Sequence, residues 1–288
     1  MINRRDFIKS AAIGSFFLGT GKSESNETTK KIILCFDGNK RPEKWREVID
    51  LGEELKDLRG YASFSVYGNS CFWYQNAKGQ SEIGWGGSKE EIDERIELTQ
   101  RAIDLGHEFG NHTVRHLHGG KWSYNQWAEE LGEFDEHAAE VLKNKDGEPY
   151  HCLGYRAPFL EWNDEMLKAL SDLGYLYDIS PPGDFVRESM GIKVIGVPMY
   201  TRDNGSKILG MDYNWHFHKV SDKELERMLE REYKSKNPLI VSLHFSDWQH
   251  GEKNYFEVVR DFMISKAKSE EVEFPSMIDY YRSLKVEE

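Results

Sequence analysis

Short apolar runs alternate with amphipathic stretches through most of the chain. The runs are rich in β-branched and aromatic residues and have the length of buried strands, while the stretches between them repeat apolar residues at helical spacing. The expected strands cover residues 31–36, 61–68, 107–112, 152–157, 175–179, 192–197 and 239–245. The expected helices cover residues 42–55, 90–105, 123–142, 164–173, 222–234, 254–267 and 275–284. This alternation predicts parallel strands joined by crossover helices.

Several helix ends are marked by residues that favour them. Pro42 stands in the first turn of one expected helix, Ser88 precedes another as a cap, and Gly106 follows that second helix. Neither a glycine- or serine-rich linker nor an internal repeat interrupts the interior. We therefore expect residues 29–288 to form one α/β domain.

Five residues with reactive or metal-binding side chains lie at or just after the carboxyl ends of expected strands. They are Asp37, His112, Arg156, Asp178 and His244. A β/α barrel builds its active site at this face, and an open doubly wound sheet also binds its ligands there. The pattern predicts a functional site at the carboxyl ends of the strands, whichever of the two folds forms.

His112 and His116 are four residues apart in the segment GNHTVRH. If this segment forms a helical turn, both imidazoles lie on one face and can bind one metal ion. A catalytic zinc site takes about three protein ligands and leaves one position open, and Asp37 is the candidate third ligand. The segment is not the zincin motif, because Thr113 stands where that motif has its glutamate.

Three further segments accompany the histidine pair: GYRAPF at 154–159, LGYLYDIS at 173–180 and PLIVSLHFSDW at 238–248. In this order, together with the Asp-Gly of KKIILCFDGN, they resemble the polysaccharide deacetylases, carbohydrate esterase family 4. The resemblance runs from about residue 31 to about residue 284. It implies a distorted seven-stranded β/α barrel that removes acetyl groups from a glycan. It also implies one divalent metal ion, with zinc as the first choice.

The first motif departs from the family pattern, which is usually Thr-Phe-Asp-Asp-Gly, with one aspartate as base and the next as metal ligand. Here Cys35-Phe36-Asp37-Gly38 offers a single aspartate. Aligned on the glycine, Asp37 is the ligand and the base is missing; aligned on the phenylalanine, Asp37 is the base and the ligand is missing. We favour the ligand, because two histidines without a carboxylate would hold a metal weakly.

The remaining candidate residues are expected to have roles in acyl hydrolysis. His244 becomes the general acid, and Asp178 is expected to hold its second ring nitrogen. The backbone N–H of Phe159 becomes a donor to the oxyanion. Arg156 would orient a carboxylate, which is either Asp37 or the unidentified base. The best spare carboxylate for that base is Asp212, followed by Asp247.

Two loops carry aromatic residues that could face a glycan. Residues 68–89 include Trp73 and Trp85 among several glycines, and residues 209–218 combine aromatic residues with Asp212, His216 and His218. Long loops in compact domains are often binding elements. A loop packed by its own aromatic residues is the alternative for residues 68–89.

Composition limits the partners. The formal net charge is −12, which leaves no basic surface for nucleic acid or for an anionic membrane. Hydrophobic residues make up 39% of the chain, enough for a large core. Cys35, Cys71 and Cys152 have no metal-binding spacing and lie in or beside apolar runs, so buried thiols are expected, with one disulfide as the alternative.

The first 28 residues are typical of an export signal rather than of the fold. Arg4 and Arg5 precede a short apolar stretch, as in a twin-arginine signal, and this stretch is shorter than a membrane span. We expect the twin-arginine machinery to export the protein to the periplasm or beyond, without stable insertion in the membrane. If no base reaches the site, the alternative is a non-catalytic relative that binds metal and glycan.

Overall fold

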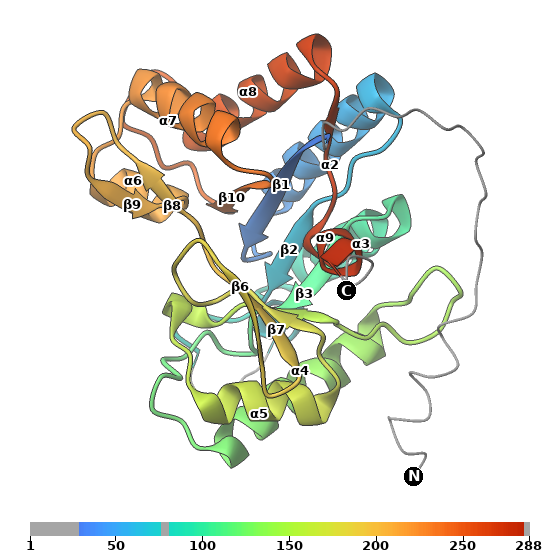
Figure 1. Ribbon diagram of the computed structural model, residues 1–288. Coiled ribbons are helices and arrows are strands. Elements are labelled where there is room, and N and C mark those ends of the chain that lie inside the picture. The colour runs from blue at the N-terminus through green and yellow to red at the C-terminus, as the bar shows by residue number, and fades with distance from the viewer. Residues whose placement is uncertain (1–28, 76–80, 285–288) are drawn as a thin grey trace, which may run out of the picture.

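The computed structural model describes residues 29–75 and 81–284, which form an α/β fold around a curled sheet (Figure 1). The strands are β1 (Lys30–Asp37), β2 (Ser65–Gly68), β3 (Glu108–Asn111), β4 (Gly154–Tyr155), β5 (Tyr177–Asp178), β6 (Val186–Ser189), β7 (Ile192–Ile195), β8 (Met199–Thr201), β9 (Lys207–Leu209), β10 (Leu239–His244) and β11 (Val272–Glu273). The helices are α2 (Pro42–Arg59), η1 (Ser70–Trp73), α3 (Lys89–Leu105), α4 (Tyr124–Val141), η2 (Pro158–Leu160), α5 (Asp164–Leu173), α6 (Asp212–Phe217), α7 (Asp222–Ser235), α8 (Tyr255–Ser269) and α9 (Met277–Leu284).

The main sheet has the order β10–β1–β2–β3–β4–β5–β7, with every neighbouring pair parallel. Strand β6 adds an antiparallel edge to β7, and β11 pairs with the start of β1. The described strands curl into a half-barrel, so the expected distorted β/α barrel of seven parallel strands is confirmed. All seven carboxyl ends therefore lie on one face.

The helix boundaries follow from local chemistry. Helix α3 begins with a capping box, in which Ser88 accepts from the backbone N–H of Glu91 and the Glu91 carboxylate accepts from the backbone N–H of Ser88. It ends at Gly106, whose φ of 101° lies in the left-handed region that glycine tolerates. Helix α2 ends at Gly60 in the same way and is one turn longer than the sequence predicts.

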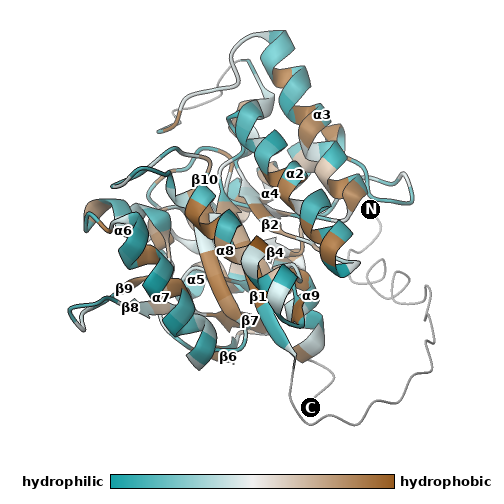
Figure 2. Ribbon diagram, turned by 90° about the horizontal axis from the view of Figure 1, so that it is seen from above, coloured by the Kyte–Doolittle hydropathy of each residue, from teal (hydrophilic) through white to brown (hydrophobic). Residues whose placement is uncertain are grey.

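The helices bury their apolar stripes against the sheet. In Figure 2 the helices carry teal and brown residues on different sides, as amphipathic helices do. Helices α4 and α5 pack side by side below the sheet in Figure 1, and α2, α7 and α8 lie on the opposite side. The β8–β9 hairpin and α6 form a separate lobe beside β10, which the hydrophobic pattern does not predict.

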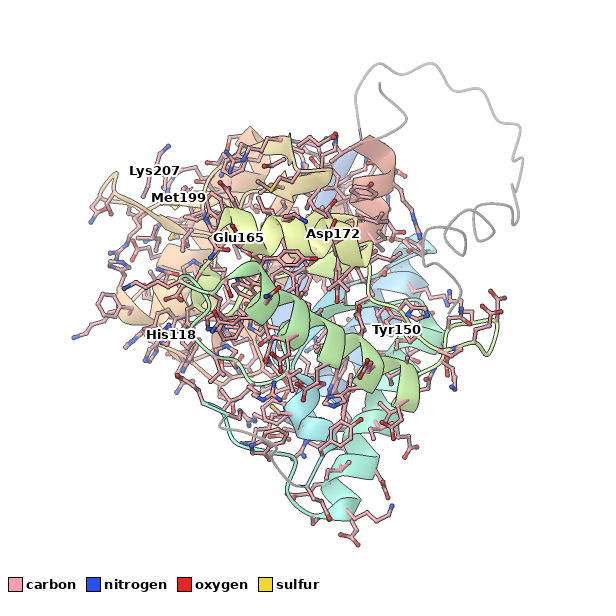
Figure 3. The ribbon with its side chains drawn as sticks, turned by 90° about the horizontal axis from the view of Figure 1, so that it is seen from below. His118, Tyr150, Glu165, Asp172, Met199 and Lys207 are labelled. Atoms are coloured by element: carbon pink, nitrogen blue, oxygen red, sulfur yellow. The ribbon has the colours of Figure 1, made fainter. Side chains whose placement is uncertain are left out.

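A cavity of about 790 Å³ lies at the opposite end of the barrel from the strand carboxyl ends. Its lining includes the start of β3 at Glu108, the loop at Tyr150 and helix α9 at Ile278. Figure 3 labels Tyr150 and His118, which lie at opposite ends of α4. His118 is the one nearer the carboxyl-end face. This cavity therefore does not lie where the reactive side chains meet.

All three cysteines are buried, and none forms a disulfide, as the apolar surroundings predict. The described helices include none that is both long and apolar enough to span a bilayer.

Candidate active site

The residues predicted from the strand ends do meet at one face. Asp37 is the last residue of β1 and pairs in register with His244, the last residue of β10. Asp178 ends β5, while His112 and Arg156 each follow the last residue of a strand, β3 and β4. This juxtaposition follows from parallel pairing, since neighbouring parallel strands end at the same edge.

Arg156 holds Asp37. The guanidinium is fully buried, and its Nη1 donates to Asp37 Oδ1 at 2.9 Å. Its other nitrogens donate to the Ile179 carbonyl at 3.1 Å and to Ser242 Oγ at 3.0 Å, so the arginine is fixed in place. Burial alone would raise the pKa of Asp37, but the charges of Arg156 and the nearby histidines outweigh it and lower that pKa.

Asp212 holds His244. Its Oδ1 lies 2.6 Å from His244 Nδ1, and its Oδ2 accepts from the His244 backbone N–H at 2.7 Å. Burial alone would lower the pKa of His244, but the Asp212 charge and hydrogen bond raise it. The structure thus gives Asp212 the position that the sequence assigned to Asp178, and Asp212 is committed to the histidine rather than free to act as the base.

Asp178 takes no part in this pair. It is fully buried, and its Oδ1 accepts from Ser180 Oγ, which itself accepts from the backbone N–H of Ala157 at 2.7 Å. Its Oδ2 has no hydrogen-bond partner. Burial raises the pKa of Asp178 to about 7. The expectation that Asp178 holds the His244 ring is wrong, because its carboxylate hydrogen-bonds within its own strand-end segment.

The histidine pair forms in a loop, not in the helical turn expected from its spacing. Thr113 and His116 have φ values of 68° and 55°, both in the left-handed region. The loop still brings the two rings together, with their centroids 5.0 Å apart. His112 Nδ1 lies 2.7 Å from the Arg156 carbonyl, which leaves Nε2 free, and His116 Nδ1 is buried without a partner.

Burial favours the neutral form of both rings. Burial lowers the pKa of His116 to about 3 and also lowers the pKa of His112. Neutral imidazoles keep a nitrogen lone pair for a ligand.

The expected third metal ligand does not complete the pair. Asp37 Oδ1 is bound to Arg156, and its Oδ2 lies 3.9 Å from His244 Nε2. Within residues 29–75 and 81–284, no group of three or more His, Cys, Asp or Glu side chains could hold a metal ion. Among the described residues, the donors present do not fit a three-ligand metal site.

Phe159 stands at the edge of the histidine pair. Its φ of 56° is left-handed, and its ring lies 4.7 Å from the His116 ring and stacks on His118 at 3.8 Å between centroids. The side chain is 47% exposed, so it forms an open wall of the site. Its backbone N–H as an oxyanion donor stays a prediction.

The aromatic residue beside His244 is not one of those predicted from the glycine-rich loop. Trp73 is only 3% exposed and packs on Phe109 and Phe134, so it belongs to the core and cannot stack on a sugar. Trp85 is half-buried and packs against the same core. The ring beside His244 is that of Trp248, 5.1 Å away between centroids. The sequence signal that could have identified Trp248 is its position four residues after His244, in the loop that follows strand β10.

Asp247, the second candidate base, is paired elsewhere. Its carboxylate accepts from Arg41 Nη1 at 2.7 Å and from Lys44 Nζ at 2.5 Å, both at the start of α2. These pairs tie the loop after His244 to helix α2.

Comparison with protein families agrees with this geometry. The family model described as polysaccharide deacetylase matches residues 24–177, more than half of the chain. The chain belongs to the polysaccharide deacetylase family. No curated protein matches the chain.

Solved structures share the fold at low sequence identity. The chain resembles a putative polysaccharide deacetylase from Mycobacterium smegmatis with a TM-score of 0.64 and 14% identity, over 95% of this chain and 96% of that one. It also resembles the peptidoglycan deacetylase PdaC from Bacillus subtilis, with a TM-score of 0.54 and 13% identity over 90% and 93% of the chains. A third is BA3943, a CE4 family pseudoenzyme from Bacillus anthracis, with a TM-score of 0.51 and 13% identity over 88% and 66%.

Proposed function

We propose that this protein hydrolyses acetyl groups on a polysaccharide or oligosaccharide. The observation that carries the proposal is the pairing of Asp37 with Arg156 beside the pairing of His244 with Asp212. Asp37 Oδ2 and His244 Nε2 are 3.9 Å apart, so a carboxylate and an imidazole face the same small space. Hydrolysis of an acyl group needs such an arrangement, with one group to remove a proton and another to supply one.

Asp37 is the proposed general base. With its pKa lowered, the carboxylate is ionised at neutral pH and can accept a proton from the attacking water. Arg156 fixes the orientation of that carboxylate through Oδ1 and leaves Oδ2 for the water. This choice follows the alignment on Phe36, in which the single aspartate of the first motif is the base.

His244 is the proposed general acid. With its pKa raised by Asp212, the imidazole is more often protonated at neutral pH, and Nε2 can give its proton to the departing amine or alkoxide. Asp212 fixes the ring through Nδ1, so Nε2 is the nitrogen that faces the site. We assign the oxyanion to the Phe159 backbone N–H by resemblance to the family. Loss of one such donor commonly costs about 10²–10³ in rate.

The substrate class rests on the family and on the aromatic walls of the site. Phe159 lies beside His116 and Trp248 lies beside His244, and both are aromatic rings that could stack on sugar rings. Family membership supports an acetylated glycan as the substrate.

A non-catalytic glycan-binding role is the second candidate. The incomplete set of metal donors favours it, and a pseudoenzyme is among the structural neighbours. This role predicts that acetylated oligosaccharides bind the protein without release of acetate.

The test is acetate release from a panel that includes chitooligosaccharides, peptidoglycan, acetylated xylan and aryl acetates. We expect release from at least one glycan, and a loss of about 10²–10⁴ in turnover for His244→Ala. The loss should be smaller on aryl acetates, because their leaving groups need no proton. Glycan binding with no release from any member of the panel would support the non-catalytic role instead.

Zinc and export remain proposals of their own. We propose His112 and His116 as protein ligands of a divalent ion. We further propose that the twin-arginine machinery exports the protein to the periplasm or beyond. The signal and any boundary at residue 28 lie outside the described residues.

A further inference from the structure

Asn39 is a fully buried polar residue with an unused donor. It follows the single aspartate of the first motif by two positions and has no exposed surface. Its Oδ1 accepts from the backbone N–H of Asn69 at 2.9 Å, whereas its Nδ2 has no partner. A buried amide nitrogen without a hydrogen-bond acceptor destabilises the folded state, and such a group in a native protein calls for an explanation.

The surroundings of Asn39 are also those of His112. Asn69, which binds the Asn39 side chain, donates from Nδ2 to the backbone carbonyl of His112. Gly68 accepts from the His112 backbone N–H at 2.9 Å, and a Cβ placed on Gly68 would lie 3.0 Å from Asn39 Cγ. Asn39 and the histidine loop therefore pack against the same two residues at the end of β2.

The histidine loop contributes a second unpartnered atom. His116 Nδ1 is buried without a hydrogen bond, and His112 presents Nε2, since its Nδ1 is bound to a carbonyl. Zinc sites take imidazole nitrogens and carboxylate oxygens, with about three protein ligands where one position stays open. An amide Nδ2 is a donor only and cannot bind a cation.

We propose that Asn39 stands at the third ligand position of the His112–His116 site, where its amide replaces the carboxylate that a divalent ion requires. The native protein then binds zinc weakly, through two imidazoles. Asn39→Asp would supply the missing carboxylate with almost no change in side-chain size. The inference concerns the same site as the proposed function but does not depend on turnover.

The experiment measures zinc binding by calorimetry and by metal content after dialysis, for the native chain and for Asn39→Asp. We expect the substitution to tighten binding by about tenfold or more, which corresponds to ~1.4 kcal/mol. The matched control is Asn254→Asp, which makes the same charge change at the N-cap of α8, where both residues cap well. The control should bind zinc as the native chain does.

Thermal unfolding gives a second readout. Without metal, Asn39→Asp buries an uncompensated carboxylate and should melt below the native protein. Added zinc should raise its melting temperature more than that of the native chain, because a ligand that binds only the folded state stabilises it. Adding His116→Ala to Asn39→Asp should abolish both gains.

Three results would overturn the inference. One is native protein that already retains one zinc per chain after dialysis and loses it in His116→Ala, a result that needs no Asn39 variant to fold. Another is zinc binding by Asn39→Asp no tighter than by Asn254→Asp. The third is a gain produced by Gly38→Asp instead, which would place the missing carboxylate one residue earlier. Acetate assays on the same proteins then report on the proposed function separately.

Discussion

At the scale of single residues, two charged pairs meet at the ends of β1 and β10. Arg156 lowers the pKa of Asp37 against the effect of burial, and Asp212 raises the pKa of His244 against the same effect. The two shifts move the pKa values apart, which is how a site keeps one group ionised as base and the other protonated as acid.

The pH dependence of turnover follows from these directions. Asp37 must be ionised, so kcat/KM should fall only at acid pH, below the ordinary aspartate value of 3.8. His244 must be protonated, so kcat/KM should also fall as pH rises through its pKa, which lies above the ordinary value of 6.5. Asp212→Asn removes the charge that raises this pKa and should move the alkaline limb to lower pH.

The control for this measurement is Asp203→Asn, because Asp203 is also paired, with Arg227 and Arg231, but lies in the β8–β9 turn against α7 rather than at a strand end of the site. Its pH profile should match that of the native enzyme. An alkaline limb that stays in place in Asp212→Asn would remove His244 from the role of acid.

Asp178 gives a stability prediction of opposite sign to that of a paired carboxylate. Its pKa is raised from 3.8 to about 7 by burial, so the folded state binds a proton that the unfolded state has lost between these values. Stability should therefore fall as pH rises from about 4 to 7. Asp178→Asn removes this fall and should stabilise the protein at pH 8 by about 1–3 kcal/mol, measured by urea unfolding. Equal stabilisation at pH 4 and pH 8 would contradict the argument.

At the scale of elements, the sequence predicts the strand ends well and the loops poorly. Buried parallel strands are continuous apolar runs, so the ends at Asp37 and His244 can be located by hydropathy alone. The left-handed backbone of Thr113 and His116 has no such signature, and the helical turn expected there does not form. Periodicity could not reveal that Trp73 points into the core, because it lies in a short 3₁₀ turn.

The sequence does not predict the pairing of Asp212 with His244, for a different reason. Asp212 begins α6, and the residue before it, Met211, bridges to Ser242 of β10. This contact between segments about thirty residues apart in sequence sets the carboxylate opposite the histidine, and no local pattern encodes it. The same applies to Arg156 and Asp37, which are joined only when β4 and β1 take their places in the sheet.

The loop after His244 should depend on its tie to α2. Asp247→Ala removes the contacts with Arg41 and Lys44, and we expect kcat/KM to fall several-fold because Trp248 and His244 flank that anchor. Stability should change by less than about 1 kcal/mol, since Asp247 is half exposed. Asp203→Ala, which removes a comparable pair of contacts with basic side chains, those of Arg227 and Arg231, should leave kcat/KM unchanged. A matching loss of activity in both variants would show a general effect rather than a local one.

At the scale of the whole molecule, the reactive side chains and the cavity described above lie at opposite ends of the strands. The reactive side chains lie at the carboxyl ends of the strands, and the cavity of about 790 Å³ lies at their amino ends. The sheet order places five separate segments at one face, although they span residues 37 to 244 of the sequence. The net charge of −12 does not favour polyanionic partners such as nucleic acid.

Export is the prediction that belongs to the complete chain. Residues 1–28, which the structure does not describe, carry Arg4 and Arg5 before a short apolar stretch. Fused to a folded reporter, they should carry it across the cytoplasmic membrane, because the twin-arginine route transports folded proteins. Replacing both arginines with lysine keeps the charge and should stop export, since the machinery reads the arginine pair itself. The matched control is Lys30→Arg and Lys31→Arg in the full-length protein, which alters basic residues outside the signal and should leave export intact. Export that continues with the lysine pair would assign the protein to the general secretory route.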